Sequence, residues 1–406
     1  MEHVLEWLFL DLNSFFASCE QQEHPELRGK PVGVVPMIVD TTCCLAASYE
    51  AKALGIKTGT LVREAKARCP EMRFVIADHE IYTRYNRKVV EVVESCLPVD
   101  TILSIDEMIC RLSGSQQELP NALALAERIK DRIRKEVGVC LTSSIGIAPN
   151  RFLAKLASDM KKPDGLTVLH KADLPQSLYG LKLRDLCGIG HQMEIRLNEQ
   201  GIHSIRELCM LSRQEMHDIW GGVGGDRYYL WLRGEEVILP PTQHRSMGHQ
   251  HVLEPELRNP EGVWVVIKKL LAKAAVRLRK EGYYTGRITA HIDFIGEIPS
   301  WAKDIKVEPT QDTLKLMTAL RNIWPIIKRE IPLRVGVTFS DLITKERYQL
   351  PLFENPHRED LGPAMDKINS KYGKETISIG ALHQFPQAAP PRIAFRRIPD
   401  LEEFER

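Results

Sequence analysis

The 406-residue sequence lacks the long apolar runs of membrane-spanning proteins. No run approaches the roughly 18 consecutive apolar residues that a spanning helix needs. The first residues, MEHVLEWLFLDLN, contain acids and no basic cluster ahead of an apolar stretch, so they do not resemble a signal peptide. We therefore expect a cytoplasmic protein that has no contact with a membrane.

Cysteines with metal-binding or redox spacing are also missing. The chain has nine cysteines, and Cys43 and Cys44 are adjacent, but there is no C-x-x-C pair. Zinc sites and the disulfide frameworks of secreted proteins depend on such spacings. Most of the cysteines are therefore expected to be reduced residues of the core.

A strong net charge is absent as well, because 55 basic and 54 acidic residues leave a formal charge of +1. This balance hides any asymmetry between segments. Hydrophobic residues make up 43% of the chain and charged residues 27%, which is typical of globular proteins. The chain is too long for one ordinary core, so we expect several domains.

Strand and helix patterns alternate over the first 165 residues, as in an α/β region. The expected strands are 5–10, 31–35, 101–105, 107–112 and 141–147, and the expected helices are 13–22, 48–54, 61–69, 81–96, 121–137 and 151–160. Asn150 is the expected cap of the last helix. From about 175 to 238 short helices alternate with glycines, which indicates a separate helical module.

A second region of strands and helices follows the polar, proline-containing stretch 239–245, which suits a linker. Its pattern predicts an α+β domain over 246–345. The expected helices are 263–281 and 313–328, and the expected strands include 287–294 and 333–339. The tail from residue 346 contains proline-rich segments and one expected helix, 360–372.

Three carboxylates stand at the ends of apolar runs. Asp106 and Glu107 close one run in Ser104-Ile105-Asp106-Glu107, and Asp11 ends the run WLFL. Mg²⁺ prefers oxygen ligands and retains waters and substrate phosphates, so acids without nearby His or Cys suit a phosphoryl-transfer site. Taken alone, this segment fits a solvated pair of acids at a strand end more often than a metal site.

The helical module contains two glycine-rich turns, Gly188 with Gly190 and Gly222 with Gly224. Glycine lets backbone N–H groups face outward at a helix N-terminus, where a phosphate can bind. A glycine helix cap is the alternative for either turn alone, whereas two turns in tandem favour DNA. Six Lys and Arg residues in the expected helix 263–281 can contact phosphates or form an ordinary solvated face.

In combination, these segments closely resemble the Y-family, or translesion, DNA polymerases, and especially the bacterial DNA polymerase IV-like branch. Residues 5–345 contain five of the family's motifs in one order: LDLNSFFASCEQ, AASYEAKALGIKTG, SIDE, SIGIAPNRFLAKLASDMKKPDG and LCGIG. The resemblance implies a multidomain α+β right-hand polymerase. It would have a palm (1–22 and 78–165), small fingers (23–77), a helix-hairpin-helix thumb (166–238) and an α+β little finger (246–345).

The resemblance also implies roles for individual residues. Asp11, Asp106 and Glu107 match the catalytic, metal-binding carboxylates, and the backbone carbonyl of Leu12 matches a further ligand. The implied cofactor is a pair of Mg²⁺ ions, with Mn²⁺ as an alternative, that stabilise the attacking 3′-oxygen and the leaving pyrophosphate.

The nucleotide and the DNA would meet other residues. Phe16, next to Phe15, matches the steric gate that rejects a 2′-hydroxyl. The residues that match triphosphate contacts are Tyr49, Lys52 and Lys162, and those expected to bind the DNA backbone are Gly188, Gly190, Gly222 and Gly224.

Two departures from the family pattern put details in doubt. Lys52 stands where the family usually has arginine, so bidentate phosphate contact is lost while the charge remains. The segment Met108-Ile109-Cys110-Arg111 replaces one that often reads Ala, an aromatic, an aliphatic and Asp. The packing of the palm beside the acids is therefore in question.

The tail contains Gln349-Leu350-Pro351-Leu352-Phe353, which resembles the peptide with which bacterial polymerases bind the sliding clamp. Such a peptide buries its Leu and Phe side chains in a pocket, and a flexible tether raises its local concentration. The expected contacts are Gln349, Leu350, Leu352 and Phe353. The alternative is that the apolar pair docks on its own domain.

The expected function is template-directed DNA synthesis from dNTP on a primer–template, with low fidelity, across damaged template and with low processivity off the clamp. We expect a monomer without a proofreading exonuclease. One alternative is a non-catalytic DNA- and clamp-binding homologue, which would have lost the three acids. Another is a structure-specific nuclease or repair protein, which would not need Phe16 or the segment from Tyr49 to Lys52.

Overall fold

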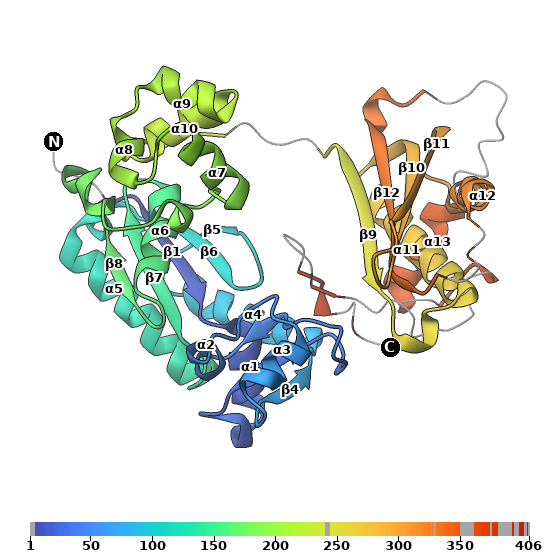
Figure 1. Ribbon diagram of the computed structural model, residues 1–406, viewed down its shortest axis with the longest axis horizontal. Helices are drawn as coiled ribbons and strands as arrows, with labels where there is room; N and C mark the ends of the chain where they lie inside the picture. The colour runs from blue at the N-terminus through green and yellow to red at the C-terminus, as the bar shows by residue number, and fades with distance from the viewer. Residues whose placement is uncertain are drawn as a thin grey trace. The chain divides into compact units, whose positions relative to one another are not determined.

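The computed structural model describes residues 5–239, 244–325, 327, 330–349, 361–373, 376–380, 392–393, 398–401 and 404. The chain divides into two compact units, Met1–Leu239 with Arg392–Leu401 and Pro240–Pro391 with Glu402–Arg406 (Figure 1). The division after Leu239 falls in the stretch predicted as a linker. None of the helices in the described ranges is long and apolar enough to cross a membrane.

A five-stranded sheet organises the first unit. Its order is β5 (Val99–Ile102), β6 (Glu107–Arg111), β1 (Trp7–Leu12), β7 (Ser143–Ala148) and β8 (Leu166–Val168). The central strand β1 is antiparallel to β6 and to β7, whereas β7 and β8 are parallel. β8 continues the sheet beyond residue 165, the expected end of this part of the chain.

Both faces of β1 are buried, because its side chains alternate between two cores. Leu8 and Leu10 belong to the core on one face. That core also includes residues of α1 (Phe15–Glu23), α4 (His79–Glu94) and α5 (Leu119–Arg132), which a π-helical turn (Ile133–Val137) extends. Trp7 and Phe9 belong to the other core, beneath α6 (Arg151–Met160).

Helix α6 lies very close to the sheet. A Cβ built on Gly146 of β7 would fall 2.1 Å from the Ala154 carbonyl oxygen, so only glycine fits this contact. Asn150 caps the helix, since its side chain accepts a hydrogen bond of 2.8 Å from the Leu153 N–H. Both the predicted bounds of the helix and its predicted cap are confirmed.

A small three-stranded sheet follows α1 in sequence. Its order is β3 (Ala46–Ala47), β2 (Val32–Val35) and β4 (Arg73–Ile76), and the short helices α2 (Tyr49–Ala53) and α3 (Val62–Arg68) belong with it. These elements share a separate core. β4 was not predicted; it has four residues, and none of its side chains is fully buried.

The helical module consists of α7 (His191–Glu199), α8 (Ile205–Met210), α9 (Arg213–Trp220) and α10 (Val223–Trp231). Ser204 with Glu207 and Ser212 with Glu215 form capping boxes at the starts of α8 and α9. The module shares its core with α6 and with the outer face of the large sheet.

The second unit is a four-stranded antiparallel sheet with helices. Its order is β11 (Trp301–Thr310), β10 (Tyr283–Phe294), β12 (Pro332–Thr344) and β9 (Ser246–Val252). Helices α11 (Pro260–Lys280) and α12 (Thr313–Ile323) share a core with the sheet, and α13 (Leu361–Tyr372) contacts α11. This unit is the predicted α+β region, with the additional strand β11.

The six basic residues of α11 do not share one exposed face, since two of them are buried and Lys280 is exposed. Lys268 and Lys269 are 9% and 5% exposed. Arg279 pairs with Asp366 of α13 through two hydrogen bonds of 2.5 and 2.9 Å, and Arg277 pairs with Glu281. Most of this helix therefore packs within its own unit, because its apolar residues require burial on several sides.

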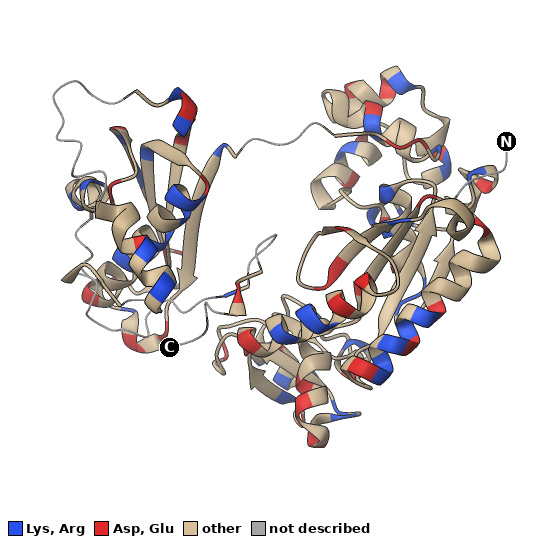
Figure 2. Cartoon of the chain, turned by 180° about the vertical axis from the view of Figure 1, so that it is seen from behind, with Lys and Arg blue, Asp and Glu red and all other residues tan. Residues whose placement is uncertain are grey.

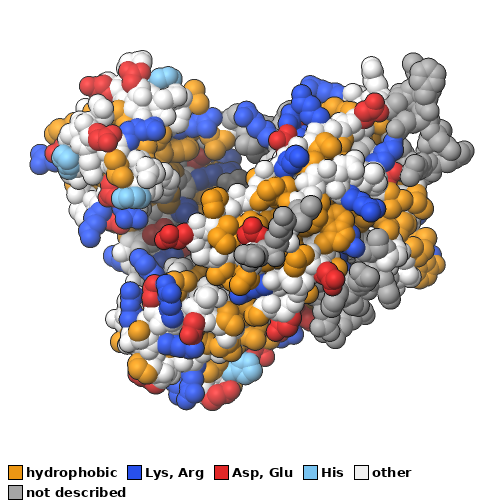
Figure 3. All heavy atoms as spheres, turned by 45° about the vertical axis from the view of Figure 1, so that its right-hand side comes forward, with side chains coloured by type: hydrophobic (Ala, Val, Ile, Leu, Met, Phe, Trp, Pro, Cys, Tyr) orange, Lys and Arg blue, Asp and Glu red, His pale blue; other side chains and the backbone are white. Residues whose placement is uncertain are grey.

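Charges of both signs are interspersed over the described residues of each unit. Red and blue residues both occur on the helices drawn in Figure 2, and the face shown in Figure 3 carries blue and red side chains among apolar ones. This distribution agrees with the net charge of +1.

Candidate active site

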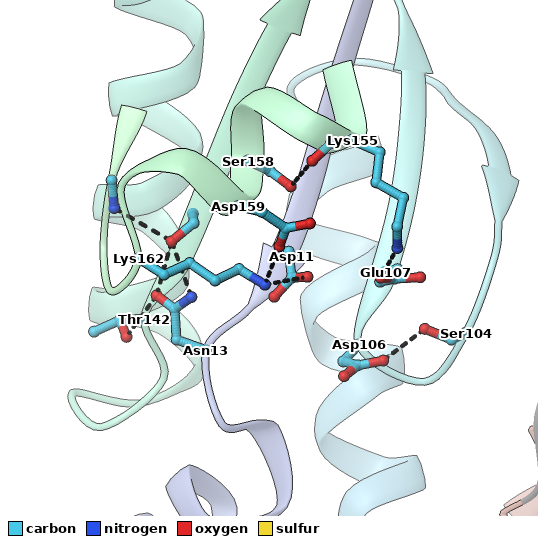
Figure 4. Close-up of polar contacts among 12 residues, drawn as sticks. Asp11, Asn13, Ser104, Asp106, Glu107, Thr142, Lys155, Ser158, Asp159 and Lys162 are labelled. Carbon is cyan, nitrogen blue, oxygen red and sulfur yellow. Dashed lines mark hydrogen bonds and ion pairs between the residues drawn. The ribbon is translucent and has the colours of Figure 1, made fainter. Parts of the chain in front are cut away.

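The three predicted carboxylates lie at one end of the central strands β1 and β6 (Figure 4). Asp11 of β1 lies directly opposite Glu107 of β6 in the strand register. The Leu12 N–H donates a hydrogen bond of 2.8 Å to the Asp106 carbonyl oxygen. Since β6 begins at Glu107, Asp106 lies just outside the strand, where it is not bound by the alternation of side chains between faces.

Two lysines from the α6 region hold two of these acids. The Lys162 Nζ lies 2.6 Å from Asp11 Oδ2 and 2.7 Å from Asp159 Oδ1. The Lys155 Nζ pairs with Glu107 Oε1. These residues share one side of α6 and the turn after it, because they are spaced by four and then three positions. The third acid, Asp106, accepts a hydrogen bond of 2.5 Å from the Ser104 hydroxyl.

Burial makes the Asp11 carboxylate costly to ionise. Asp11 is 7% exposed, and its burial, with the nearby charges of Asp106 and Asp159, raises its pKa to about 6 although Lys162 opposes this shift. Burial would lower the pKa of Lys162, but contact with Asp11 and Asp159 raises it above its usual value. A positive charge beside Asp11, such as that of Lys162, therefore stabilises the ionised carboxylate.

The donor set fits a hard divalent cation. Asp11, Asp106 and Glu107 offer only oxygen ligands, as Mg²⁺ and Mn²⁺ prefer. Over the described ranges no three His, Cys, Asp or Glu side chains already converge as a cation site. Instead, the ammonium groups of Lys155 and Lys162 supply the positive charge at two of the acids.

Asn13 fixes the loop that carries Lys162. Its side-chain oxygen accepts a hydrogen bond of 2.7 Å from the Asp164 N–H, and its amide nitrogen donates one of 2.9 Å to the Ser144 hydroxyl. Asn13 is 1% exposed, so these bonds form away from water. The turn after α6 is thereby tied to the end of β1.

A cavity of about 210 Å³ opens beside the acids. Its walls contain acids, cations, aromatic rings and small residues: Asp11, Leu12, Ser14, Phe15, Phe16, Leu45, Ala46, Ala47, Tyr49, Lys52, Thr58, Ile105, Asp106 and Lys162. Every nucleotide-contacting residue expected from the sequence is among them.

Lys52 brings a second cation into this cavity, near Lys162, which already pairs with Asp11 and Asp159. Burial and repulsion by Lys162 lower the pKa of Lys52, whose Nζ lies 4.4 Å from the centre of the Tyr49 ring. Burial raises the pKa of the Tyr49 hydroxyl. A phosphate bound here would relieve the repulsion between the two ammonium groups.

The rings of Phe15 and Phe16 have different surroundings. Phe15 is 3% exposed within the main core, whereas Phe16 is only partly buried. Phe16 stacks on Tyr82 of α4, with ring centres 4.2 Å apart and 14° between the planes. The ring of Phe16 is thus supported from behind while it lines the cavity.

The predicted glycines lie at the expected helix starts. Gly190 and Gly222 precede α7 and α10, and a Cβ on either would meet no atom within 4 Å. Gly188 has φ +90°, and Gly224 lies in the first turn of α10. The Tyr228 hydroxyl of α10 donates to the Cys187 carbonyl and so joins the two turns.

The two remaining expectations concern β6 and the tail. Met108, Ile109 and Cys110 are buried, so the unusual flank packs within the palm-like sheet. Of the expected clamp peptide, Gln349 is described and exposed, whereas residues 350–353 lie outside the described residues.

Sequence reasoning did not identify Asn13, Lys155 and Asp159 as site residues. The spacing K-x-x-x-D-x-x-K in KLASDMKK was a usable signal, since it places Lys155, Asp159 and Lys162 along one side of a helix. Nothing in that spacing alone indicates which strand the helix covers.

Known proteins resemble this chain over both units. Two models match it: the impB/mucB/samB family over residues 10–159, and the C-terminal domain of that family over residues 244–352. The chain is 36% identical over 384 residues to DNA polymerase IV of Moorella thermoacetica, covering 91% of this chain and 94% of that protein. It is 31% identical over 383 residues to DNA polymerase IV 1 of Bacillus subtilis, covering 92% of each.

Solved structures also match. A Y-family DNA polymerase chimera of Dbh and Dpo4 gives a TM-score of 0.69 at 24% identity, covering 84% of this chain and 100% of that chain. An insertion ternary complex of Dbh DNA polymerase gives a TM-score of 0.56 at 25% identity, with the same coverage.

Proposed function

This chain belongs to the impB/mucB/samB family of Y-family DNA polymerases and is a translesion DNA polymerase, and we propose that Asp11, Asp106 and Glu107 are its catalytic carboxylates. The observation that carries the proposal is the position of these acids at the end of β1 and β6, beside a cavity whose wall also contains Lys52 and Lys162. The enzyme joins a deoxynucleotide to a primer 3′-hydroxyl and acts in DNA repair and damage tolerance.

Each region of the chain can be assigned to one domain of the family's right-hand architecture. We assign residues 1–22 and 78–165 to the palm, 23–77 to the fingers, 166–238 to the thumb and 246–345 to the little finger. The strand β8, at the start of the assigned thumb, still belongs to the palm sheet.

Y-family polymerases need divalent metal ions, and we propose Mg²⁺, with Mn²⁺ as a substitute, on the three carboxylates and the Leu12 carbonyl. Bound there, the ions would stabilise the charge of the attacking and leaving oxygens. The strands would hold the three acids at one end of the sheet. If Asp11 bound a metal ion, Lys162 would still pair with Asp159.

The nucleotide would lie in the cavity beside the acids. We propose that Lys52, Lys162 and Tyr49 hold its triphosphate, because all three line the cavity and a bound phosphate would stabilise the charge of Lys52, which lies near Lys162. Phe16, supported by Tyr82, would stand against the sugar and exclude a 2′-hydroxyl, with Phe15 fixed beneath. Positioning and charge stabilisation are the main means by which such an enzyme accelerates the reaction.

The DNA would contact the thumb. The solved relatives include polymerases in insertion and post-insertion complexes, and this chain accordingly binds primer–template DNA and nucleotide. We propose that the N–H groups beside Gly188, Gly190, Gly222 and Gly224 bind the backbone, since a phosphate can approach glycine closely. We also propose that Gln349–Phe353 binds a bacterial sliding clamp. The protein is proposed to be a monomer and to be located in the cytoplasm.

Primer extension tests the catalytic assignment. Asp106→Asn keeps the shape of the side chain and removes its charge, so kcat should fall about a hundredfold or more, which corresponds to several kcal/mol of lost charge stabilisation. Binding of primer–template, measured by fluorescence anisotropy, should stay as in the wild type. The matched control is Asp131→Asn, at a carboxylate that is 56% exposed on α5. Extension by Asp106→Asn at the wild-type rate would refute the assignment.

A further inference from the structure

The first compact unit includes a short segment from the far end of the chain, Arg392–Leu401, which we call the C-terminal strap. Residues 392–393 and 398–401 of the strap are described. Ile393 and Ile398 pack against the main core of this unit, and Pro399 is buried. The strap is therefore attached mainly by burial of apolar side chains. Such burial stabilises a contact more than an exposed ion pair does.

Residues near both ends of the strap contact helix α4. The Ile393 N–H points at the His79 Nδ1, at a long hydrogen-bond distance of 3.4 Å. Arg87 Nη2 lies 3.4 Å from Asp400 Oδ1. Because His79 and Arg87 are eight residues apart, these contacts are separated by about two turns of the helix. The two ends of the strap thus meet two successive parts of α4.

His79 has a second neighbour, the proposed steric gate. Its ring meets the ring of Phe16 edge-on, with centres 6.1 Å apart and 89° between the planes. It also lies 6.0 Å from Tyr82, on which Phe16 stacks. Tyr82 is fully buried and its hydroxyl donates to the Glu20 carboxylate, so it has little freedom to move. His79 and Tyr82 together form the support behind Phe16.

The hydrogen bond from the strap requires a neutral imidazole, because a protonated ring has no acceptor. Burial, reinforced by the nearby charge of Arg392, lowers the pKa of His79 to about 4, although Asp78 opposes the shift. The ring is therefore neutral near pH 7, and its Nδ1 can accept from the Ile393 N–H.

From these contacts we propose that the C-terminal strap fixes α4 behind Phe16 and, through His79 as a positioning residue, sharpens the rejection of ribonucleotides. A gate excludes a 2′-hydroxyl only if its ring is held to within a fraction of an ångström, and looseness in its support widens the space for the sugar. The inference rests on the proposed role of Phe16.

Two variants of the full chain separate the parts of this proposal. Ile398→Asp places a carboxylate in the apolar contact and should release the strap. His79→Ala leaves that apolar contact in place and removes the ring between the strap and the gate. The matched control is Leu361→Asp, which makes the same kind of change at a residue of α13 that is 50% exposed.

Two readouts are needed, because a loss of total activity would follow from any misfolding. Hydrogen exchange of the α4 amides should become faster in Ile398→Asp and stay unchanged in Leu361→Asp. The ratio of kcat/KM for a ribonucleotide to that for the matching deoxyribonucleotide should rise about threefold to tenfold in Ile398→Asp and in His79→Ala, as expected for a loosened but present gate. The deoxyribonucleotide KM should change little.

Phe16→Ala distinguishes a failure of the strap from a failure of the gate. If Phe16→Ala raises ribonucleotide insertion while both other variants keep the wild-type ratio, the gate stands and the role of the strap is refuted. Unchanged α4 exchange in Ile398→Asp would show that the strap does not brace the helix and would also refute it. An unchanged ratio in Phe16→Ala would overturn the gate, and with it the role of the strap in sugar selection.

Discussion

At the scale of single residues, the candidate active site contains lysines that pair with its acids. Lys155 and Lys162 each neutralise one carboxylate at the end of the central strands. Without such partners, several acids this close and this buried would repel one another and resist ionisation. Lys162 differs from Lys155 because a second carboxylate, Asp159, also holds it.

The double contact of Lys162 gives a prediction for Asp159. When Asp11 binds a cation, Asp159 remains to keep the Lys162 ammonium group at the cavity. Asp159→Asn should therefore raise the KM for the incoming nucleotide about threefold to tenfold, and kcat should fall less, because a positioning contact for the triphosphate is weakened while the carboxylates remain.

Steady-state single-nucleotide insertion measures both constants. Asp173→Asn, at an exposed residue of a short 3-10 turn, is the matched control and should match the wild type. If Asp159→Asn lowered kcat alone, Asp159 would act on the chemical step instead of on nucleotide binding.

The acids themselves could be predicted from sequence, whereas their partners could not. Asp11, Asp106 and Glu107 close apolar runs within a set of ordered motifs, so they could be proposed as site residues without coordinates. Lys155 and Asp159 belong to an amphipathic helix whose covered face is set by long-range packing on β1 and β7. The role of His79 depends on a strap more than 300 positions away in the chain, which no local pattern reveals.

At the scale of elements, α6 is the piece that joins the sheet to the site. It carries Lys155 and Asp159, and its approach to β7 depends on the missing side chain at Gly146. The predicted bounds of α6 were correct because a strong cap and a clear apolar stripe both mark them. β11 was missed because WAKDIKVEPT carries charges on its exposed side, and β8 because it has only three residues.

The tight contact at Gly146 gives a prediction for stability. Gly146→Ala would place a methyl group 2.1 Å from the Ala154 carbonyl oxygen, so α6 must shift outward. The free energy of unfolding should fall by about 1–3 kcal/mol, as for other overpacked contacts. Polymerase activity should fall as well, because the shift moves Lys155 and Asp159.

Urea denaturation followed by circular dichroism measures the loss. Gly180→Ala is the matched control, since a Cβ there would meet no atom within 4 Å. A Gly146→Ala protein as stable as the control would mean that α6 does not need this close approach.

At the scale of the whole molecule, the tail begins in the second unit and contributes Arg392–Leu401 to the first. Helix α13 is fastened to α11 by the Arg279 to Asp366 pair, whereas the strap packs against α4. The expected clamp peptide, 349–353, lies between the last strand of the little finger and α13.

The clamp proposal predicts a loss that depends on the partner. Replacing Leu352 and Phe353 together by Ala removes the two side chains expected to fill a pocket on the clamp. Clamp-stimulated primer extension should drop to the unstimulated level, because such anchors supply most of the binding energy of a short peptide. Synthesis without the clamp should stay as in the wild type, since the carboxylates and the cavity belong to the other unit. Exchanging Leu361 for Ala, in α13 beyond the peptide, is the matched control. Equal stimulation of the double variant and the wild type by the clamp would rule out this peptide as the clamp-binding site. Reduced synthesis without the clamp would instead favour the alternative, in which Leu352 and Phe353 pack on their own domain.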